Sequence, residues 1–141
     1  MGKIRPVVLG LVQQGDRLLV GEGYDPVKQE TFYRALGGGI EFGETSLVAL
    51  RREFQEEIQA ELMNIHYLGC LENLFIYNGK PGHEIIQLYR CDFADPMFYQ
   101  REELVVKEGN ITGIARWISF CDFQSGRYRL VPEPCLEYLG G

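Results

Sequence analysis

The sequence predicts an α/β domain in which helices pack against a mixed β-sheet. Two observations support this fold class. Short runs rich in Val, Ile, Leu and aromatic residues recur between glycine-containing turns, which is typical of strands. Between residues 45 and 58 the apolar residues instead recur every third or fourth position, which is typical of a helix. A length of 141 residues suits a single domain spanning 1–141, with no linker or internal repeat.

The N-terminal third contains three predicted strands. Residues 4–12 and 17–21 are apolar, and the turn residues 14–16 between them favour a hairpin. Residues 22–31 are polar and predict a loop. A third strand, 32–36, leads into three consecutive glycines.

From Thr45 the pattern of apolar residues becomes helical. Leu47, Leu50, Phe54 and Ile58 recur at helical spacing. We therefore expect the side of the helix that carries Leu47, Leu50 and Phe54 to face the core.

The second half returns to strand patterns. Residues 66–77 and 83–93 are long strand candidates, and the segment 78–82 between them contains Asn-Gly, a strong turn signal. Residues 94–113 predict a loop with a partial helix. Residues 114–119 predict the last core strand, before a short C-terminal segment with a final turn or two of helix.

The charge of the chain limits its partners. The net charge is −6, from 20 acidic and 14 basic residues, which argues against non-specific binding to nucleic acid or to an anionic membrane. An anionic substrate stays compatible with this charge, because bound divalent cations reverse the local field. The N-terminal segment lacks the apolar core of a signal peptide, and no apolar run is long enough to span a bilayer, so we expect a cytoplasmic protein.

The four cysteines are widely spaced and form no CxxC pair, and the sequence holds two histidines. This composition offers little to a zinc site. We expect reduced, mostly packed thiols.

Three glutamates form the most informative pattern. Glu53, Glu56 and Glu57 stand at i, i+3 and i+4, so their side chains project from one helical face. Like charges at this spacing destabilise a helix by roughly 0.2–0.5 kcal/mol per pair, and the end of a helix disfavours anions. The pattern is consistent either with a solvated acidic face or with ligands of a hard cation such as Mg²⁺.

The neighbours of these glutamates favour the cation. Arg52 precedes them and can orient a carboxylate by a hydrogen bond. Before the helix, glycines 37–39 and 43 let the backbone approach a ligand closely. Glu41 and Glu44 add carboxylates to the same turn.

The segment 38–60 resembles the signature of the Nudix hydrolase family. In this sequence Gly38 is followed after five residues by Glu44 and, after seven more, by Arg-Glu-Phe-Gln-Glu-Glu at 52–57. A chance match of the six strict positions is on the order of one in a hundred thousand at ordinary residue frequencies. Gln59 departs from the pattern, which has glycine there. Without that glycine, we expect the helix to continue toward Asn64.

The resemblance implies a fold, an activity and a cofactor. The fold is an α/β/α sandwich around a mixed β-sheet. The activity is cleavage of the phosphoanhydride bond of a nucleoside diphosphate linked to another moiety, such as a nucleotide sugar, a nucleoside triphosphate or a dinucleoside polyphosphate. The cofactor is one to three Mg²⁺ or Mn²⁺ ions, and the protein is a monomer or homodimer acting on this small substrate.

The resemblance also implies roles for individual residues. Glu53, Glu56 and Glu57 bind the metal ions, with the backbone carbonyl of Gly37 as a further ligand. Arg52 orients Glu53, and Glu44 supports one of these two. The general base is either Glu53 or a glutamate in 102–113, for which Glu108 is the first choice and Glu103 the second.

Candidate substrate-binding residues are less specific. The aromatic residues on predicted strands either stack a base or pack in the core. Tyr77 is similar in position to a tyrosine of dinucleoside polyphosphate hydrolases of this family. Arg34 and Arg90 either contact phosphate or form surface ion pairs. The candidate aromatic residues are Phe32, Tyr33, Phe75, Tyr77 and Tyr89.

Two other functional classes are compatible with the sequence. One is a catalytically silent, nucleotide-binding regulatory domain of the same fold, which normally lacks one or more motif glutamates. The other is a structural protein with an acidic, cation-binding helix. All of the motif glutamates are present here, which favours the enzyme.

Overall fold

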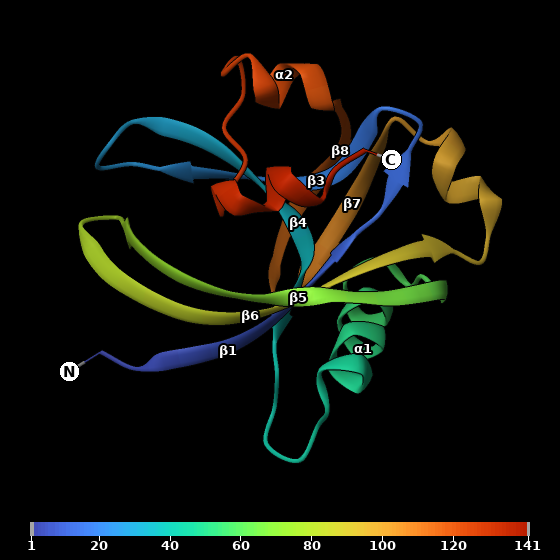
Figure 1. The fold of residues 1–141 in the computed structure, drawn as a ribbon, viewed down its shortest axis with the longest axis horizontal. Helices are drawn as coiled ribbons and strands as arrows, with labels where there is room; N and C mark the ends of the chain where they lie inside the picture. The colour runs from blue at the N-terminus through green and yellow to red at the C-terminus, as the bar shows by residue number, and fades with distance from the viewer. Residues whose placement is uncertain (1, 141) are drawn as a thin grey trace.

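The computed structural model describes residues 2–140, and Figure 1 shows how its strands and helices are arranged. Within these residues, one eight-stranded sheet has the order β5-β6-β1-β4-β3-β8-β7, and β2 pairs with β3. The strands are β1 (Ile4–Leu11), β2 (Gln13–Gln14), β3 (Arg17–Asp25), β4 (Glu30–Gly39), β5 (Leu62–Tyr77), β6 (Lys80–Phe93), β7 (Glu103–Glu108) and β8 (Ile111–Ser119). The helices are α1 (Ser46–Ile58) and α2 (Phe120–Gln124), with 3₁₀ turns η1 (Pro96–Gln100) and η2 (Glu133–Tyr138).

The sheet is mixed, as predicted. β1 runs parallel to β6, with Val7 opposite Ile86, and antiparallel to β4, with Val7 opposite Gly39. The predicted hairpin between the strands at 4–12 and 17–21 is wrong. β3 pairs across the turn with the short β2, whereas β1 lies between β4 and β6.

Strand β4 belongs to both halves of the sheet. Its residues 36–39 pair with β1, and its residues 30–35 pair with β3. Beyond this shared strand the β3–β4 and β5–β6 hairpins extend in the same direction (Figure 1). Their tips meet where Lys28 Nζ donates to the Ile76 carbonyl at 3.1 Å and Tyr77 Oη donates to the Tyr24 carbonyl at 3.1 Å.

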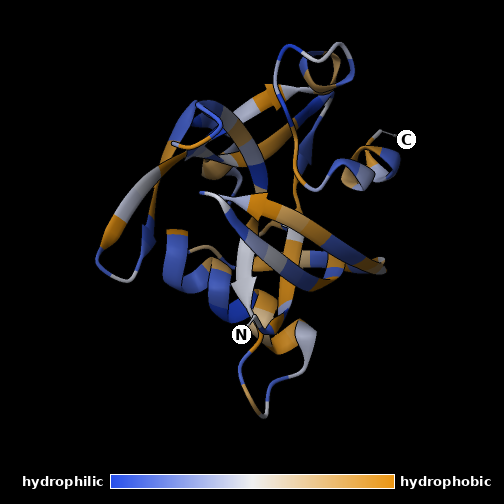
Figure 2. Cartoon of the chain, turned by 90° about the vertical axis from the view of Figure 1, so that its left-hand side faces the viewer, coloured by the Kyte–Doolittle hydropathy of each residue, from blue (hydrophilic) through white to orange (hydrophobic). Residues whose placement is uncertain are grey.

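Two hydrophobic cores lie on opposite faces of the sheet, which confirms the α/β/α sandwich. The first contains Leu50 and Phe54 of α1, packed with Trp117 of β8. The second contains Phe123 of α2 and Cys135 of η2. Figure 2 shows hydrophobic segments mainly along the strands and hydrophilic residues at most turns. Among residues 2–140, no helix combines the length and apolar character needed to cross a lipid bilayer.

Helix α1 begins as predicted, because the Thr45 hydroxyl accepts a hydrogen bond from the Val48 amide at 3.2 Å. The expected inward position of Leu47 is wrong, because Leu47 is 39% exposed. Ala49 is buried instead, so the apolar stripe runs along a neighbouring line of the helix. The ring of Phe54 packs on Gly10, where a Cβ would lie 2.9 Å from it.

The helix ends at Ile58, and the expected continuation toward Asn64 is wrong. Gln59 adopts a left-handed conformation with φ of 53°, which is the role of the glycine in the family pattern. The amide of Gln59 donates to the Gln55 carbonyl, and the amide of Ala60 donates to the Phe54 carbonyl. These bonds close the helix despite the cost of a left-handed non-glycine residue, roughly 1 kcal/mol.

Replacing Gln59 by Gly is therefore expected to stabilise the protein by about 0.5–1 kcal/mol. Urea unfolding monitored by circular dichroism measures this change. Gln55→Gly is the matched control, because Gln55 is an exposed residue inside α1 where glycine costs about 1 kcal/mol. Equal destabilisation by both substitutions would contradict the cap assignment.

Two further segments differ from prediction. Most of 22–31 is strand rather than loop, because cross-strand pairing extends β3 to Asp25 and starts β4 at Glu30. The buried Asp25 carboxylate accepts from the amides of Val27 and Lys28, which fixes the remaining turn. Segment 94–113, predicted as a loop with a partial helix, contains the 3₁₀ turn η1 but also β7 and the start of β8.

Cysteine reactivity gives a test of the cores. Cys70 and Cys121 are exposed, whereas burial raises the pKa of Cys91 to about 12 and that of Cys135 to about 11. We expect iodoacetamide at pH 8 to label the first two thiols rapidly, and the other two only after unfolding. Peptide mass spectrometry measures the four sites separately. Rapid native labelling of Cys135 would contradict the packing of η2.

Candidate functional site

A cavity of about 1400 Å³ lies between the two hairpins and the glutamate-bearing face of α1. It brings together most of the candidates predicted from the sequence. Glu44 and Arg52 do not line it, and Glu103 instead forms an ion pair with Arg116 at 3.0 Å. The predicted residues that line the cavity are Phe32, Arg34, Gly37, Glu53, Glu56, Glu57, Phe75, Tyr77 and Glu108.

Arg52 anchors the turn before α1 to the helix. Its guanidinium donates to both Glu44 carboxylate oxygens at 2.7 and 2.8 Å and to the Gly39 carbonyl at 2.9 Å. It also donates to Glu53 Oε1 at 2.8 Å and, more weakly, to Glu56 at 3.3 Å. The sequence interpretation that Arg52 pairs with Glu53 and Glu44 agrees with these contacts.

The ion pair with Arg52 changes the titration of Glu44. The hydrogen bonds from Arg52 lower the pKa of Glu44 to about 2, and the Glu41 amide adds a further bond at 2.9 Å. Bonding to Glu44 in turn raises the pKa of the Arg52 guanidinium. Both groups are therefore charged at neutral pH.

Glu53 lies against the glycine turn. A Cβ at residue 38 would lie 2.5 Å from its carboxylate, so a side chain there would displace that carboxylate. Burial raises the pKa of Glu53, while its bond to Arg52 opposes that rise. Glu53 is thus held in one orientation beside the cavity.

Glu57 is the most unusual acid of the site. It is 2% exposed, and its Oε1 atom has no hydrogen-bond partner among residues 2–140. Burial, together with the nearby carboxylates of Glu108 and Glu53, raises its pKa to about 9. An unpartnered buried carboxylate costs free energy unless a ligand satisfies it.

This arrangement fits a hard divalent cation. Mg²⁺ and Mn²⁺ prefer carboxylate oxygens, and the free Glu57 oxygen lies beside two further acids. No group of three or more His, Cys, Asp or Glu side chains stands ready to hold a metal ion within 2–140. The Glu56 side chain is 58% exposed and bonded to Arg52.

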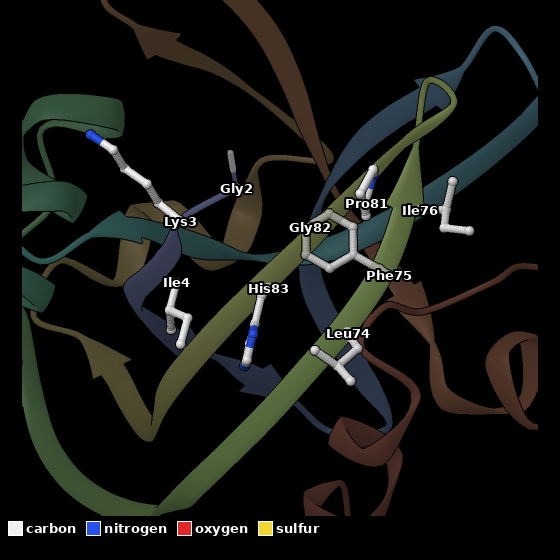
Figure 3. A pocket seen from close by; sticks show the side chains of 9 residues that line it. All are labelled: Gly2, Lys3, Ile4, Leu74, Phe75, Ile76, Pro81, Gly82 and His83. Atoms are coloured by element: carbon white, nitrogen blue, oxygen red, sulfur yellow. The ribbon is translucent and has the colours of Figure 1, made fainter.

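The aromatic candidates divide into core and cavity residues. Tyr33 and Tyr89 are 5% and 8% exposed and pack in the cores. Phe75 lies against Gly82 of the paired strand (Figure 3), where a Cβ would approach the ring to 2.2 Å. Phe32 and Tyr77 meet edge to face at 5.9 Å and come from the two different hairpins.

A second, shallower pocket of about 580 Å³ lies near the turn of the β5–β6 hairpin, beside the start of β1 (Figure 3). Exposed apolar side chains, including Ile4, Leu74 and Ile76, line it together with Lys3 and His83. None of its lining residues is a predicted catalytic residue. Phe75 is the one lining residue that was predicted to bind substrate.

The charged residues of the large cavity that were not predicted from the sequence include Glu84 and Arg5. Glu84 is 4% exposed and forms an ion pair with Arg34 at 3.0 Å, while Arg5 lies opposite Glu84 in the parallel pairing of β1 and β6. No sequence signal identifies this pair, because it depends on the strand register. Arg90 does not line the cavity and instead bonds the Tyr138 carbonyl at 2.7 Å.

Comparisons with known proteins identify relatives of this chain. The NUDIX domain profile matches residues 3–139. Over 67 residues the chain is 34% identical to the NAD-capped RNA hydrolase NudC of Pseudomonas syringae pv. tomato, and 37% identical to NudC of Pseudomonas fluorescens. These matches cover 48% of this chain but 23% and 24% of the relatives, so the chain matches about a quarter of their length.

Solved structures share the fold. A MutT NUDIX hydrolase from Burkholderia pseudomallei has a TM-score of 0.63 at 19% identity, covering 84% of this chain and 85% of that one. A NUDIX hydrolase from Nitrosomonas europaea has a TM-score of 0.62 at 18% identity, covering 96% and 87%. At these identities the likeness concerns the fold alone.

Proposed function

Because the chain belongs to the NUDIX domain family, we propose that it is a metal-dependent hydrolase of nucleoside diphosphate derivatives. The bond cleaved is the phosphoanhydride bond between the nucleoside diphosphate and its second moiety. The observation that carries the proposal is the buried Glu57 carboxylate, whose free oxygen lies beside Glu53 and Glu108 in a large cavity.

We assign the metal ions to Glu53, Glu56 and Glu57, with the Gly37 carbonyl as a further ligand. When bound, Mg²⁺ or Mn²⁺ neutralises the diphosphate and lowers the pKa of a coordinated water. Arg52 fixes the orientation of Glu53, and Glu44 fixes Arg52. Arg52 and Glu44 are therefore positioning residues.

Two carboxylates are available to accept the proton of the attacking water. Glu53 lies at the glycine turn, and Glu108 lies at the end of β7 beside Glu57. A residue that already coordinates a cation accepts a proton less readily, which favours Glu108 for this step. Glu103 lies outside the cavity lining and has no part in this proposal.

The dimensions of the cavity favour an extended substrate. Ligand sites usually enclose about 300–1000 Å³, whereas this cavity encloses about 1400 Å³. Phe32, Phe75 and Tyr77 offer ring surface to a base at the end away from α1. The two Pseudomonas relatives are named for NAD-capped RNA, so dinucleotides belong among the substrates tested.

The decisive experiment incubates the protein with Mg²⁺ or Mn²⁺ and a substrate panel. The panel contains nucleoside triphosphates, ADP-ribose, other nucleotide sugars, NAD, dinucleoside polyphosphates and NAD-capped RNA. We expect release of phosphate, pyrophosphate or a mononucleotide, which is lost with EDTA and in Glu56→Gln. Tight binding without products would instead support the catalytically silent regulatory domain.

A further inference from the structure

We propose that Arg5 and Arg34, held in place by Glu84, form a second anion subsite in the large cavity. It binds a phosphate of the substrate other than the two that flank the cleaved bond. This inference rests on the proposed hydrolase function and narrows its substrate class to compounds that carry such an additional phosphate.

The first support is the charge of this network. Arg34 Nη1 lies 3.0 Å and Arg5 Nη1 lies 3.7 Å from the Glu84 carboxylate, so two cations face one anion. The Asn73 amide also donates to Glu84 at 3.3 Å. The Glu84 side chain is 5% exposed, so the anion at the centre is buried and held in place. The group formed by Arg5, Arg34 and Glu84 has one positive charge in excess.

The second support is the number of free donors. Among residues 2–140, neither the Arg5 nor the Arg34 guanidinium forms an aligned hydrogen bond, because their contacts with Glu84 are ion pairs of poor hydrogen-bond geometry. A guanidinium presents five N–H donors in a planar fork that matches phosphate oxygens. These donors line the cavity and are available to a ligand.

The third support is the position of Arg5. Its guanidinium lies along the backbone at Gly39, where a Cβ would lie 3.2 Å from Nη2. The adjacent Gly38 contacts the Glu53 carboxylate. Arg5 and Glu53 line the same cavity, so one substrate can reach both.

Two other cationic side chains of the cavity are engaged. Arg129 donates to Glu30 at 2.8 Å, and Lys28 Nζ donates to the Ile76 carbonyl at 3.1 Å.

Matched substrate pairs test the proposal. ApppA and AppA differ by a phosphate within the chain, and NADP and NAD differ by a phosphate on the ribose. We expect wild-type kcat/KM to favour the phosphate-rich member of at least one pair by tenfold or more. Arg5→Gln and Arg34→Gln should each abolish that preference, and the pair affected identifies which phosphate is bound.

Arg129→Gln is the matched control, because it removes one positive charge from the same cavity and should keep the preference. If Arg34→Gln fails to fold, the double variant Arg34→Gln/Glu84→Gln removes both partners of the ion pair. Equal kcat/KM within both pairs, or a preference that persists in Arg5→Gln and in the Arg34 variants, would overturn the proposal.

A binding measurement separates this inference from the proposed activity. In EDTA, millimolar tripolyphosphate should raise the Tm of the wild type more than that of Arg5→Gln. A shift without hydrolysis of any substrate leaves the subsite standing and refutes the hydrolase. Hydrolysis with the same shift in both proteins refutes the subsite alone.

Discussion

Replacing Glu57 by Gln is expected to lower turnover by at least ~10²-fold while stabilising the metal-free protein. The substitution removes a buried carboxylate whose oxygen has no partner and which lies beside Glu108 and Glu53. The amide of Gln also donates a hydrogen bond to a neighbouring acid. Together these effects should stabilise the protein in EDTA by about 1–2 kcal/mol.

Thermal unfolding with and without Mn²⁺ measures the stability of both proteins and tests whether Glu57 binds the cation. A cation at a hundred times its Kd should stabilise the wild type by about 2.7 kcal/mol, and this gain should be largely absent from Glu57→Gln. The control is Glu61→Gln, an exposed acid that does not line the cavity. An unchanged rate at saturating substrate and limiting Mg²⁺, or an equal Mn²⁺ response, would refute the ligand role.

Replacing Arg52 by Gln should destabilise the protein by about 2–4 kcal/mol. It should also lower turnover by at least tenfold. The guanidinium is 21% exposed and supports the half-buried carboxylates of Glu44 and Glu53, which would be left close together without a cation. Arg51→Gln is the matched control. Arg51 is the neighbouring residue, and its guanidinium makes one long hydrogen bond, of 3.3 Å, to the Leu62 carbonyl. A comparable loss in both variants would contradict this assignment.

The same ion pair predicts a pH dependence. The folded pKa of Glu44 is about 2, below its ordinary value of 4.5, so ionised Glu44 favours the folded state at neutral pH. This contribution is complete above pH 4.5 and is lost as the pH falls toward 2. Urea unfolding between these limits should show a weaker acid dependence in Glu44→Gln than in wild type.

The helix and its glutamates could be predicted from sequence because both depend on local spacing. Glu53 and Glu57 are four residues apart on any helix, whatever the fold around them. The prediction was wrong at Gln59 because propensity disfavours a left-handed glutamine, whereas two backbone hydrogen bonds close the helix there. It was wrong at Leu47 because the angular position of the buried stripe depends on what α1 packs against.

The charged network across the cavity could not be predicted in the same way. Arg5 and Glu84 are far apart in the chain and meet only through the parallel register of β1 and β6. The strand content of 22–31 was missed for a related reason, since a polar segment becomes a strand when its partner supplies the hydrogen bonds. Pairing between distant segments leaves no local pattern.

The packing of the glycine turn limits how this protein can be diversified. At residue 37 a Cβ would lie 2.0 Å from the Val8 carbonyl oxygen, and at residue 38 it would lie 2.5 Å from Glu53. A saturation library at these two positions should return glycine alone among active clones, whereas Phe32 and Phe75 offer positions where new substrate preferences can be selected.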